Sequence, residues 1–185
     1  MKNSFSMLAM ALAATLLAGC GQKNKTDYII APKAVKRAAS SPVRMQEHTQ
    51  SKEVNWAGSR LVCEIKRTPC DSLPMVKDDT GQKFVDNSIT LTIRRGDGSV
   101  FLEKTFTKAT FHDAIDADYR KTGILEGIVF DRIDGASLRF AASVCHPQTD
   151  EYIPLVVLVA ANGSVAISRD TQLDTNGTEE EDGDD

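Results

Sequence analysis

Apolar and polar residues alternate along most of residues 56–169, and short runs of glycine, asparagine and aspartate interrupt the alternation. Because successive side chains of a strand point to opposite faces, this pattern is typical of strands with one buried and one solvated face. The interruptions have the composition of tight turns, which favour antiparallel pairing of consecutive strands. We therefore expect an antiparallel β structure over this region, with a first strand at residues 59–66.

Three hairpins are predicted, each from two alternating runs separated by a turn that contains glycine. They join residues 89–93 to 100–106, 124–133 to 136–144, and 153–161 to 165–167. The connecting turns are Gly96-Asp97-Gly98, Asp134-Gly135 and Asn162-Gly163. Glycine supplies the positive φ that tight hairpin turns require. Residues 155–159 are apolar on both faces, so this strand is expected to be central and covered on both sides.

One segment follows a helical period instead. Phe111, Ile115 and Tyr119 recur every four residues across 109–121, and Thr110 can cap the start, so a short amphipathic helix is predicted here. The opposite face carries His112, Asp113, Asp116 and Asp118. We interpret these polar residues as a solvated helix face rather than a metal or acid/base site, because acidic residues are favoured in the first turn of a helix.

These elements predict an all-β fold with one short helix, in a single domain over residues 53–170. An antiparallel meander of this kind can close into a small lipocalin-like barrel, which removes its sheet edges, or fold into a two-sheet sandwich. The sequence pattern is compatible with both arrangements.

The N-terminal residues have the pattern of a bacterial lipoprotein signal. Lys2 precedes an apolar stretch at residues 7–17 that is too short to span a hydrocarbon core of about 30 Å. The run Leu17-Ala18-Gly19-Cys20 then forms a lipobox. We expect residues 1–19 to be removed and Cys20 to be acylated, which places the protein in the bacterial cell envelope with a lipid anchor as its membrane partner.

Charge is distributed unevenly outside the predicted domain. The charged residues of segment 20–52 are mainly basic, and the segment is rich in serine, alanine and proline. It is therefore interpreted as a flexible linker. Residues 171–185 are acidic and contain no base, which is typical of a disordered, solubilising tail. The tail lacks the glycine and glutamate positions of an EF-hand loop. A nearly neutral domain without a basic stripe argues against nucleic acid as a partner.

Three cysteines remain once Cys20 is acylated. Cys63 and Cys70 bracket a turn-like Arg67-Thr68-Pro69, and a short-loop disulfide between them is the preferred prediction. A bridge from Cys63 to Cys145 is the alternative. Cys145 lies beside His146, but neighbouring strand side chains diverge, which argues against a nucleophilic pair.

No cofactor, metal or catalytic site is expected. The three histidines are scattered and no C-x-x-C pair is present, so a zinc site is not predicted. The chain lacks a G-x-S-x-G nucleophile elbow and a phosphate-binding glycine loop. The acidic residues between Asp78 and Asn87 are interpreted as a loop stabilised by Asx turns. We therefore expect a protein that is not an enzyme.

Several short motifs resemble those of an uncharacterised domain-of-unknown-function family of small Bacteroidetes lipoproteins. They are Leu73-Pro-Met-Val-Lys-Asp78, Lys83-Phe-Val-Asp-Asn87, Arg95-Gly-Asp-Gly-Ser99, Phe106-Thr-Lys108 and Pro147-Gln-Thr-Asp-Glu-Tyr152. The resemblance implies a lipid-anchored all-β domain with no catalytic residues to carry over. Surface-exported lipoproteins of that group usually carry acidic residues after the acylated cysteine, and residues 21–25 contain none, so an outer-membrane position facing the periplasm is expected.

The expected function is that of a non-catalytic envelope binding or protein-interaction module. The alternative is a carrier of a small hydrophobic ligand in a β-barrel cavity. A cavity of several hundred Å³ would favour the carrier, whereas a packed interior with an exposed apolar patch would favour the interaction module.

Overall fold

The computed structural model describes residues 41–171. The predicted signal sequence, the acylation site Cys20 and the first part of the basic linker lie outside the described residues. All of the acidic tail after Thr171 also lies outside them. The predictions made for those segments therefore remain predictions.

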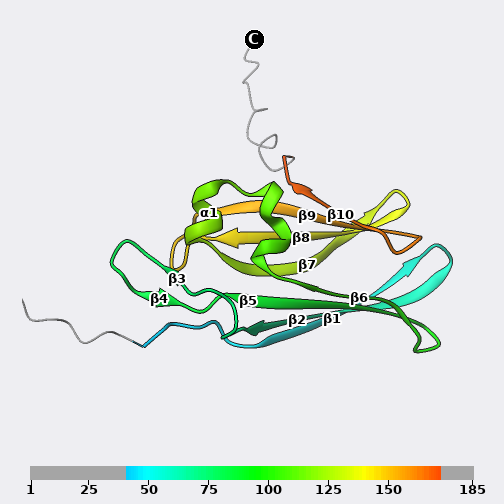
Figure 1. Cartoon of the computed structure of the whole chain (residues 1–185). Helices are drawn as coiled ribbons and strands as arrows, with labels where there is room; N and C mark the ends of the chain where they lie inside the picture. The colour runs from blue at the N-terminus through cyan, green and yellow to red at the C-terminus, as the bar shows by residue number, and fades with distance from the viewer. Residues whose placement is uncertain (1–40, 172–185) are drawn as a thin grey trace, which may run out of the picture. The chain divides into compact units, whose positions relative to one another are not determined.

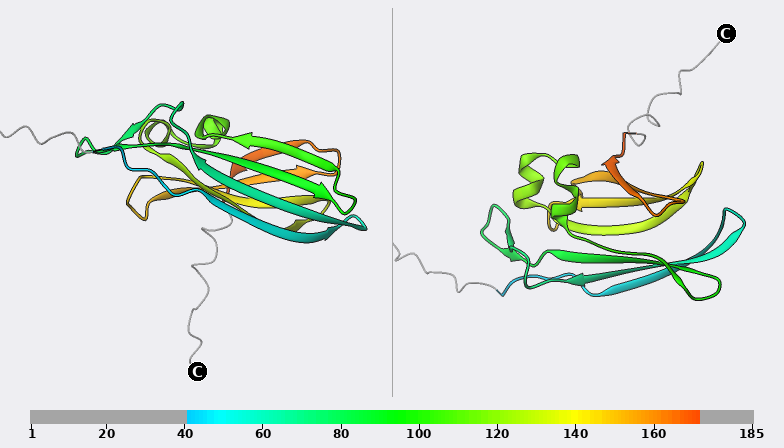
Figure 2. Two further views of the ribbon diagram at one scale, coloured as in Figure 1. Left: turned by 90° about the horizontal axis from the view of Figure 1, so that it is seen from below. Right: turned by 45° about the vertical axis from the view of Figure 1, so that its right-hand side comes forward.

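Two four-stranded antiparallel sheets face each other as separate layers (Figures 1 and 2). The first has the order β1-β2-β5-β6 and contains β1 (His48–Trp56), β2 (Ser59–Pro69), β5 (Asn87–Arg95) and β6 (Val100–Phe106). The second has the order β10-β9-β8-β7 and contains β7 (Ile124–Asp134), β8 (Ser137–Cys145), β9 (Tyr152–Ala160) and β10 (Val165–Arg169). The all-β prediction is confirmed, and the arrangement is the two-sheet sandwich rather than a closed barrel.

The three predicted hairpins are β5–β6, β7–β8 and β9–β10. In the second hairpin Asp134 pairs directly with Ser137, so the turn residues are Gly135 and Ala136. Gly135 has φ of 56°, a left-handed conformation in which glycine is favoured. The hairpin is therefore as predicted, with its turn one residue later along the chain.

The space between the sheets is filled by apolar side chains. In β8, Leu138, Phe140 and Val144 are fully buried, whereas Ser143 on the opposite face is half-buried. Each large apolar side chain buried in this way stabilises the fold by about 1.5–3 kcal/mol relative to an exposed one. The apolar strand β9 is an inner strand of its sheet, as predicted. The alternation in the sequence therefore identified the core-facing positions.

The strand β1 was not predicted, because the predicted first strand at residues 59–66 lies within β2. Residues 48–52 were assigned to the flexible linker, but they belong to β1 and pair with β2 from Arg67 to Cys63. That assignment was wrong because β1 is an edge strand whose first half is almost entirely polar and exposed. Polar edge strands lack the apolar alternation by which buried strands are recognised.

The predicted single helix over 109–121 is two shorter helices. A 3₁₀-helix, η1, spans Lys108–Ala114, and the α-helix α1 spans Ala117–Thr122. The chain is extended at Ile115, and Asp116 starts the second helix by accepting a hydrogen bond from the Tyr119 amide at 3.1 Å. The break allows both Phe111 and Ile115 to be buried. Neither helix in the described part of the chain has the length and hydropathy to cross a membrane.

A small two-stranded sheet lies outside the sandwich. It consists of β3 (Val76–Lys77) and β4 (Lys83–Phe84). Val43 pairs with its edge, donating to the Lys83 carbonyl and accepting from the Val85 amide, both at 2.9 Å. Part of the predicted linker is therefore bound to this hairpin. Figures 1 and 2 show the hairpin at the same end of the sandwich as α1, and β3 contacts α1.

Candidate binding cleft

The predicted disulfide between Cys63 and Cys70 is not present, and both cysteines are free. Arg67, Thr68 and Pro69 do not form a turn, because they continue β2 and pair with β5. A strand rises about 3.3 Å per residue, so the two cysteines lie about 20 Å apart, far beyond the 7 Å between Cα atoms that a disulfide tolerates. The prediction was wrong because Pro69 ends a strand rather than a turn.

The alternative bridge from Cys63 to Cys145 is also absent. Cys63 lies in the first sheet, and Cys145 ends β8 of the second, where it packs with Val76, Phe84 and Ile124. Burial raises the pKa of Cys63 to about 11 and that of Cys145 to about 12. Both thiols are therefore protonated at neutral pH and are poor nucleophiles.

Cys70 differs from the two buried cysteines. Its Sγ lies 3.1 Å from the Ser72 hydroxyl, and this hydrogen bond lowers the pKa of the Cys70 thiol. It is the most exposed of the three cysteines among the described residues. Cys70 is consequently the thiol most accessible to oxidants and alkylating agents.

The polar face of the predicted helix is partly solvated, as expected, and partly paired. Asp113, Asp116 and Asp118 are exposed. The His146 ring stacks on Tyr119 with 4.0 Å between ring centroids, and its Nε2 lies 3.1 Å from an Asp118 oxygen. Within residues 41–171, no group of three or more His, Cys, Asp or Glu side chains is arranged to hold a metal ion.

The acidic loop between Asp78 and Asn87 has two parts. Asp78 accepts hydrogen bonds from the amides of Thr80 and Gln82, each at 2.9 Å, and from the Thr80 hydroxyl at 2.7 Å. These hydrogen bonds lower the pKa of Asp78 and form the Asx turn predicted for this loop. Asp86, in contrast, is buried and points away from the turn into a cavity.

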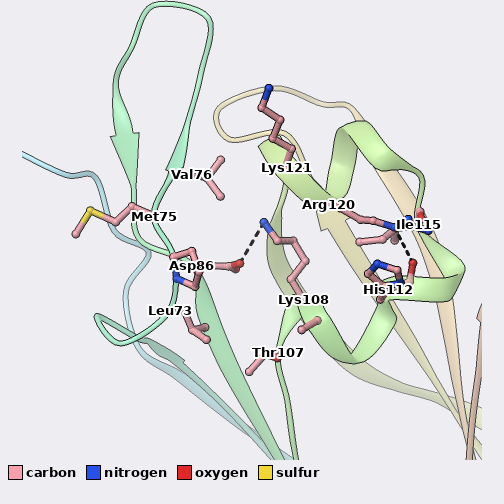
Figure 3. A pocket seen from close by; sticks show the side chains of 12 residues that line it. Leu73, Met75, Val76, Asp86, Thr107, Lys108, His112, Ile115, Arg120 and Lys121 are labelled. Carbon is pink, nitrogen blue, oxygen red and sulfur yellow. Dashed lines mark hydrogen bonds and ion pairs between the residues drawn. The ribbon is translucent and has the colours of Figure 1, made fainter.

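That cavity is a cleft of about 390 Å³ between the β3–β4 hairpin and the helices η1 and α1 (Figure 3). It is lined by Leu73, Pro74, Met75, Val76, Asp86, Thr107, Lys108, Ala109, His112, Ile115, Arg120 and Lys121. The volume falls within the range of about 300–1,000 Å³ that is usual for ligand sites. The lining combines apolar walls with several charged groups.

A buried ion pair forms the base of the cleft. The Asp86 Oδ1 accepts from the amides of Asn87 and Leu125 at 2.8 and 2.9 Å, and its Oδ2 lies 3.5 Å from the Lys108 Nζ. The same Nζ donates to the Gly123 carbonyl at 2.5 Å. Lysine has three N–H donors, and these contacts account for two of them. The ion pair thus joins the hairpin side of the cleft to the helix side (Figure 3).

The two walls are largely apolar. Leu73, Met75 and Val76 line the hairpin side, and Ile115 lines the helix side (Figure 3). Met75 is 44% exposed although it is a large apolar residue. Its thioether points away from η1 and α1 (Figure 3).

The rim of the cleft is basic. His112, Arg120 and Lys121 line it from η1 and α1, and all three are exposed. The Arg120 Nε donates to the carbonyls of His112 and Ile115 at 2.9 and 3.0 Å, which orients the guanidinium. The lining thus contains more cations than anions, because Asp86 is the single acid among its residues. Apolar walls beside fixed cations suit a ligand that has an apolar group next to a negative charge.

Sequence reasoning did not identify this cleft. In the sequence, Asp86 is one of several acids in a loop, and Lys108 stands out only within the motif Phe106-Thr-Lys108. The two residues are distant in sequence and come from different elements, so no local spacing connects them. The available signal is that both lie in motifs that carry the predicted resemblance to an uncharacterised family.

No curated protein matches the sequence. Residues 29–167 match the family described as Domain of unknown function (DUF4738), and this range covers nearly all of the described residues. The predicted resemblance to an uncharacterised family is therefore confirmed, and the chain belongs to the DUF4738 family.

Proposed function

We propose that this protein is a lipid-anchored module of the bacterial cell envelope that binds a segment of a partner protein in the cleft between the β3–β4 hairpin and η1–α1. The observation that carries the proposal is the combination of apolar walls with a rim formed by His112, Arg120 and Lys121. The preferred ligand is a peptide with an apolar side chain beside one or more carboxylates.

The groups in the cleft are better suited to binding than to catalysis. Both Asp86 oxygens have partners, two backbone amides and the Lys108 ammonium, so this carboxylate is occupied in holding the structure. A general base must be free to accept a proton from a substrate, whereas the Asp86 carboxylate is already held by two amides and faces the Lys108 ammonium.

A partner segment fits the geometry better than an enclosed ligand. The sandwich interior is filled by side chains such as Phe106, Phe111 and Phe140, each fully buried. The hollow lies instead at the surface, between two short chain segments (Figure 3). Carriers of hydrophobic ligands usually bury most of the ligand surface. The carrier alternative requires a cavity inside a barrel, whereas the interior of this sandwich is filled by side chains.

The anchoring part of the proposal is supported by the lipobox at residues 17–20. The absence of acidic residues at 21–25 favours the outer membrane with the domain facing the periplasm. In that position the module would meet proteins of the envelope rather than nucleic acid. Growth in labelled palmitate, followed by mass analysis of the protein and of a Cys20→Ser variant, tests the anchor independently of the cleft.

The binding proposal is tested with a short fluorescent peptide in which leucine is flanked by glutamates. Fluorescence anisotropy is measured for the wild type, for Lys121→Glu in the cleft and for Lys66→Glu on the exposed side of β2. We expect Lys121→Glu to weaken binding by about fivefold, equivalent to roughly 1 kcal/mol, with no change for Lys66→Glu. Equal affinity of all three proteins, or no binding by any, would overturn the proposal.

Two variant peptides test the charged contact and the apolar contact separately. Replacing glutamate by glutamine in the peptide removes the charge, and replacing leucine by serine removes the apolar group. Both peptides are expected to bind more weakly than the parent. Decanoate has an apolar chain and a carboxylate but no peptide backbone. If the protein binds decanoate more tightly than every peptide, the result would instead support a carrier of a small amphiphile.

A further inference from the structure

We infer that His146, when protonated, clamps α1 to the connection between β8 and β9 and thereby positions Arg120 and Lys121 at the rim of the cleft. The inference rests on the proposed function, because it makes the binding of an acidic partner in that cleft depend on pH. His146 is not among the residues that line the cleft. It acts as a positioning residue, through the helix that carries the two cations.

The helix α1 has few contacts of its own with the sandwich. None of its six residues is buried, and Tyr119 is the residue of this helix that packs against the main core. Helices shorter than about 12 residues are marginal in water without tertiary contacts. The Arg120 Nε hydrogen bonds join α1 only to residues just before it, His112 and Ile115. The positions of the rim cations therefore depend on what holds Tyr119 and its neighbours.

The His146 side chain joins α1 to the second sheet. Its ring stacks on Tyr119, with 4.0 Å between the ring centroids and 16° between the planes. Its Nε2 lies 3.1 Å from the Asp118 Oδ2, and its Nδ1 lies 3.0 Å from the Glu151 Oε2. One ring therefore contacts two residues of α1 and one residue that directly precedes β9.

The backbone that carries this ring is held in place. His146 directly follows β8, and its amide donates to the Glu151 carbonyl at 3.0 Å. Its carbonyl accepts from the Thr149 hydroxyl at 3.1 Å and from the Thr149 amide at 3.3 Å. These hydrogen bonds close the connection at residues 146–151 against the ends of β8 and β9. When the ring contacts weaken, α1 is consequently the part that moves.

The two carboxylates favour the charged form of the ring. A carboxylate only accepts hydrogen bonds, and a neutral imidazole has a single N–H. In either neutral tautomer, one ring nitrogen therefore turns a lone pair toward a carboxylate oxygen at 3.0 or 3.1 Å. Nε2 is also buried without a hydrogen-bond partner among residues 41–171, so its contact with Asp118 is one of charge. Both contacts are attractive only in the imidazolium.

The other ionisable groups around the ring do not reverse this preference. The hollow in which His146 lies is lined by four acids and one lysine, Asp78, Asp79, Asp118, Glu151 and Lys77. An acidic surplus favours a positive ring. Burial raises the pKa of Tyr119 above its ordinary value and that of Cys145 to about 12, so both neighbours are neutral at physiological pH.

Protonation of His146 therefore closes the clamp, and loss of the proton opens it. Histidine changes its charge between about pH 5 and 8, so the clamp is closed at the acid end of this range and weakens as the pH rises. Asp118 and Glu151 are exposed, so solvent screens both ion pairs and each contributes little. The expected effect on the position of α1 is consequently about two- to fivefold.

Hydrogen exchange of the α1 amides tests the clamp without a ligand. Deuterium uptake of residues 116–123 is measured by mass spectrometry on the full chain at about pH 5.5 and 8.0, corrected for the chemical exchange rate, with β8 as the internal reference. We expect the wild type to lose protection of this segment about two- to fivefold at the higher pH, and His146→Gln to show the lower protection at both. The same pH response in both proteins would overturn the inference.

His146→Arg is the rescue variant. Its guanidinium is planar, can stack on Tyr119 and pair with both carboxylates, and stays charged at every pH used. We expect this variant to keep the protection of α1 at both pH values. Protection as low as that of His146→Gln would show that the charge of the ring does not hold the helix, and would overturn the inference.

Peptide affinity tests the link to the cleft. His112 lies at the rim and can itself take up a proton, so every protein in this series carries His112→Gln. In that background we expect the leucine–glutamate peptide to bind about two- to fivefold more tightly at the lower pH, with no such difference once His146→Gln is added. His48→Gln, at the exposed start of β1, is the control and should leave the difference unchanged.

The outcomes separate the inference from the proposed function. A pH effect that persists in the His146→Gln protein would overturn the inference and leave the proposed function standing. Absence of peptide binding by every protein would overturn the proposed function, while the exchange measurement would still decide whether His146 clamps α1.

Discussion

The Lys108 Nζ lies 3.5 Å from the Asp86 Oδ2, and this ion pair joins the β4–β5 connection to the start of η1. Both side chains are largely buried, with 14% and 4% of their surfaces exposed. A buried charge is stable only when it is paired and hydrogen-bonded, and Asp86 also accepts from the Leu125 amide at the start of β7. The pair therefore holds together the elements that form the cleft.

Removing the acid is expected to cost more than removing the base. Asp86→Ala leaves the Lys108 ammonium and two backbone amides without their acceptor, so the free energy of unfolding should fall by about 3 kcal/mol. Lys108→Met leaves Asp86 with its two amide donors and should cost about half as much. Urea unfolding of both variants measures the difference. A larger loss for Lys108→Met would contradict the central role given to Asp86.

A methyl group at Gly123 is expected to destabilise the junction of α1 and β7. A Cβ there would lie 2.8 Å from both the Tyr119 carbonyl oxygen and the Val144 Cγ1. Gly123→Ala should lower the free energy of unfolding by about 1–3 kcal/mol, as overpacking does. Gly127→Ala is the control, because no atom lies within 4 Å of its Cβ position, and it should change stability by about 0.5 kcal/mol or less.

The three thiols are expected to differ in reactivity. Cys70 is partly exposed and its pKa is lowered, whereas Cys63 and Cys145 are buried with raised pKa values. Native protein treated with iodoacetamide at neutral pH should be alkylated first at Cys70, and all three sites should react after denaturation without a reductant. Two thiols that react only after reduction would show that a disulfide forms.

Ionisation of Cys145 is expected to make the fold sensitive to alkaline pH. Its pKa is about 12 in the folded protein, raised from 9.0 by burial. A raised pKa in the folded state means that the unfolded state loses its proton first, so stability is complete below pH 9 and falls as the pH rises toward 12. The urea midpoint should therefore decrease more steeply in this range for the wild type than for Cys145→Ala. Parallel decreases would show that the Cys145 thiol does not contribute.

The hairpins could be predicted because their determinants are local. The alternation of Leu138, Phe140 and Val144 and the turns at Gly135 and Gly163 depend only on neighbouring residues, since side-chain direction and positive φ are properties of a few bonds. Where a local signal was weak, the prediction was wrong. Residues 48–52 of β1 are polar because they lie on a sheet edge, and Asp116 divides the predicted helix because it acts as an N-cap.

The sequence by itself therefore determined β2 and the three hairpins, their order along the chain and their buried faces, but not β1, β3 or β4. Only the tertiary structure decided that the meander forms two open sheets, that Cys63 and Cys70 lie too far apart to bond, and that Asp86 meets Lys108 beneath an apolar cleft. The physical reason is distance along the chain. Alternation and turns act between neighbours, whereas sheet closure, burial of an ion pair and the shape of a cleft depend on how remote segments fill the same space.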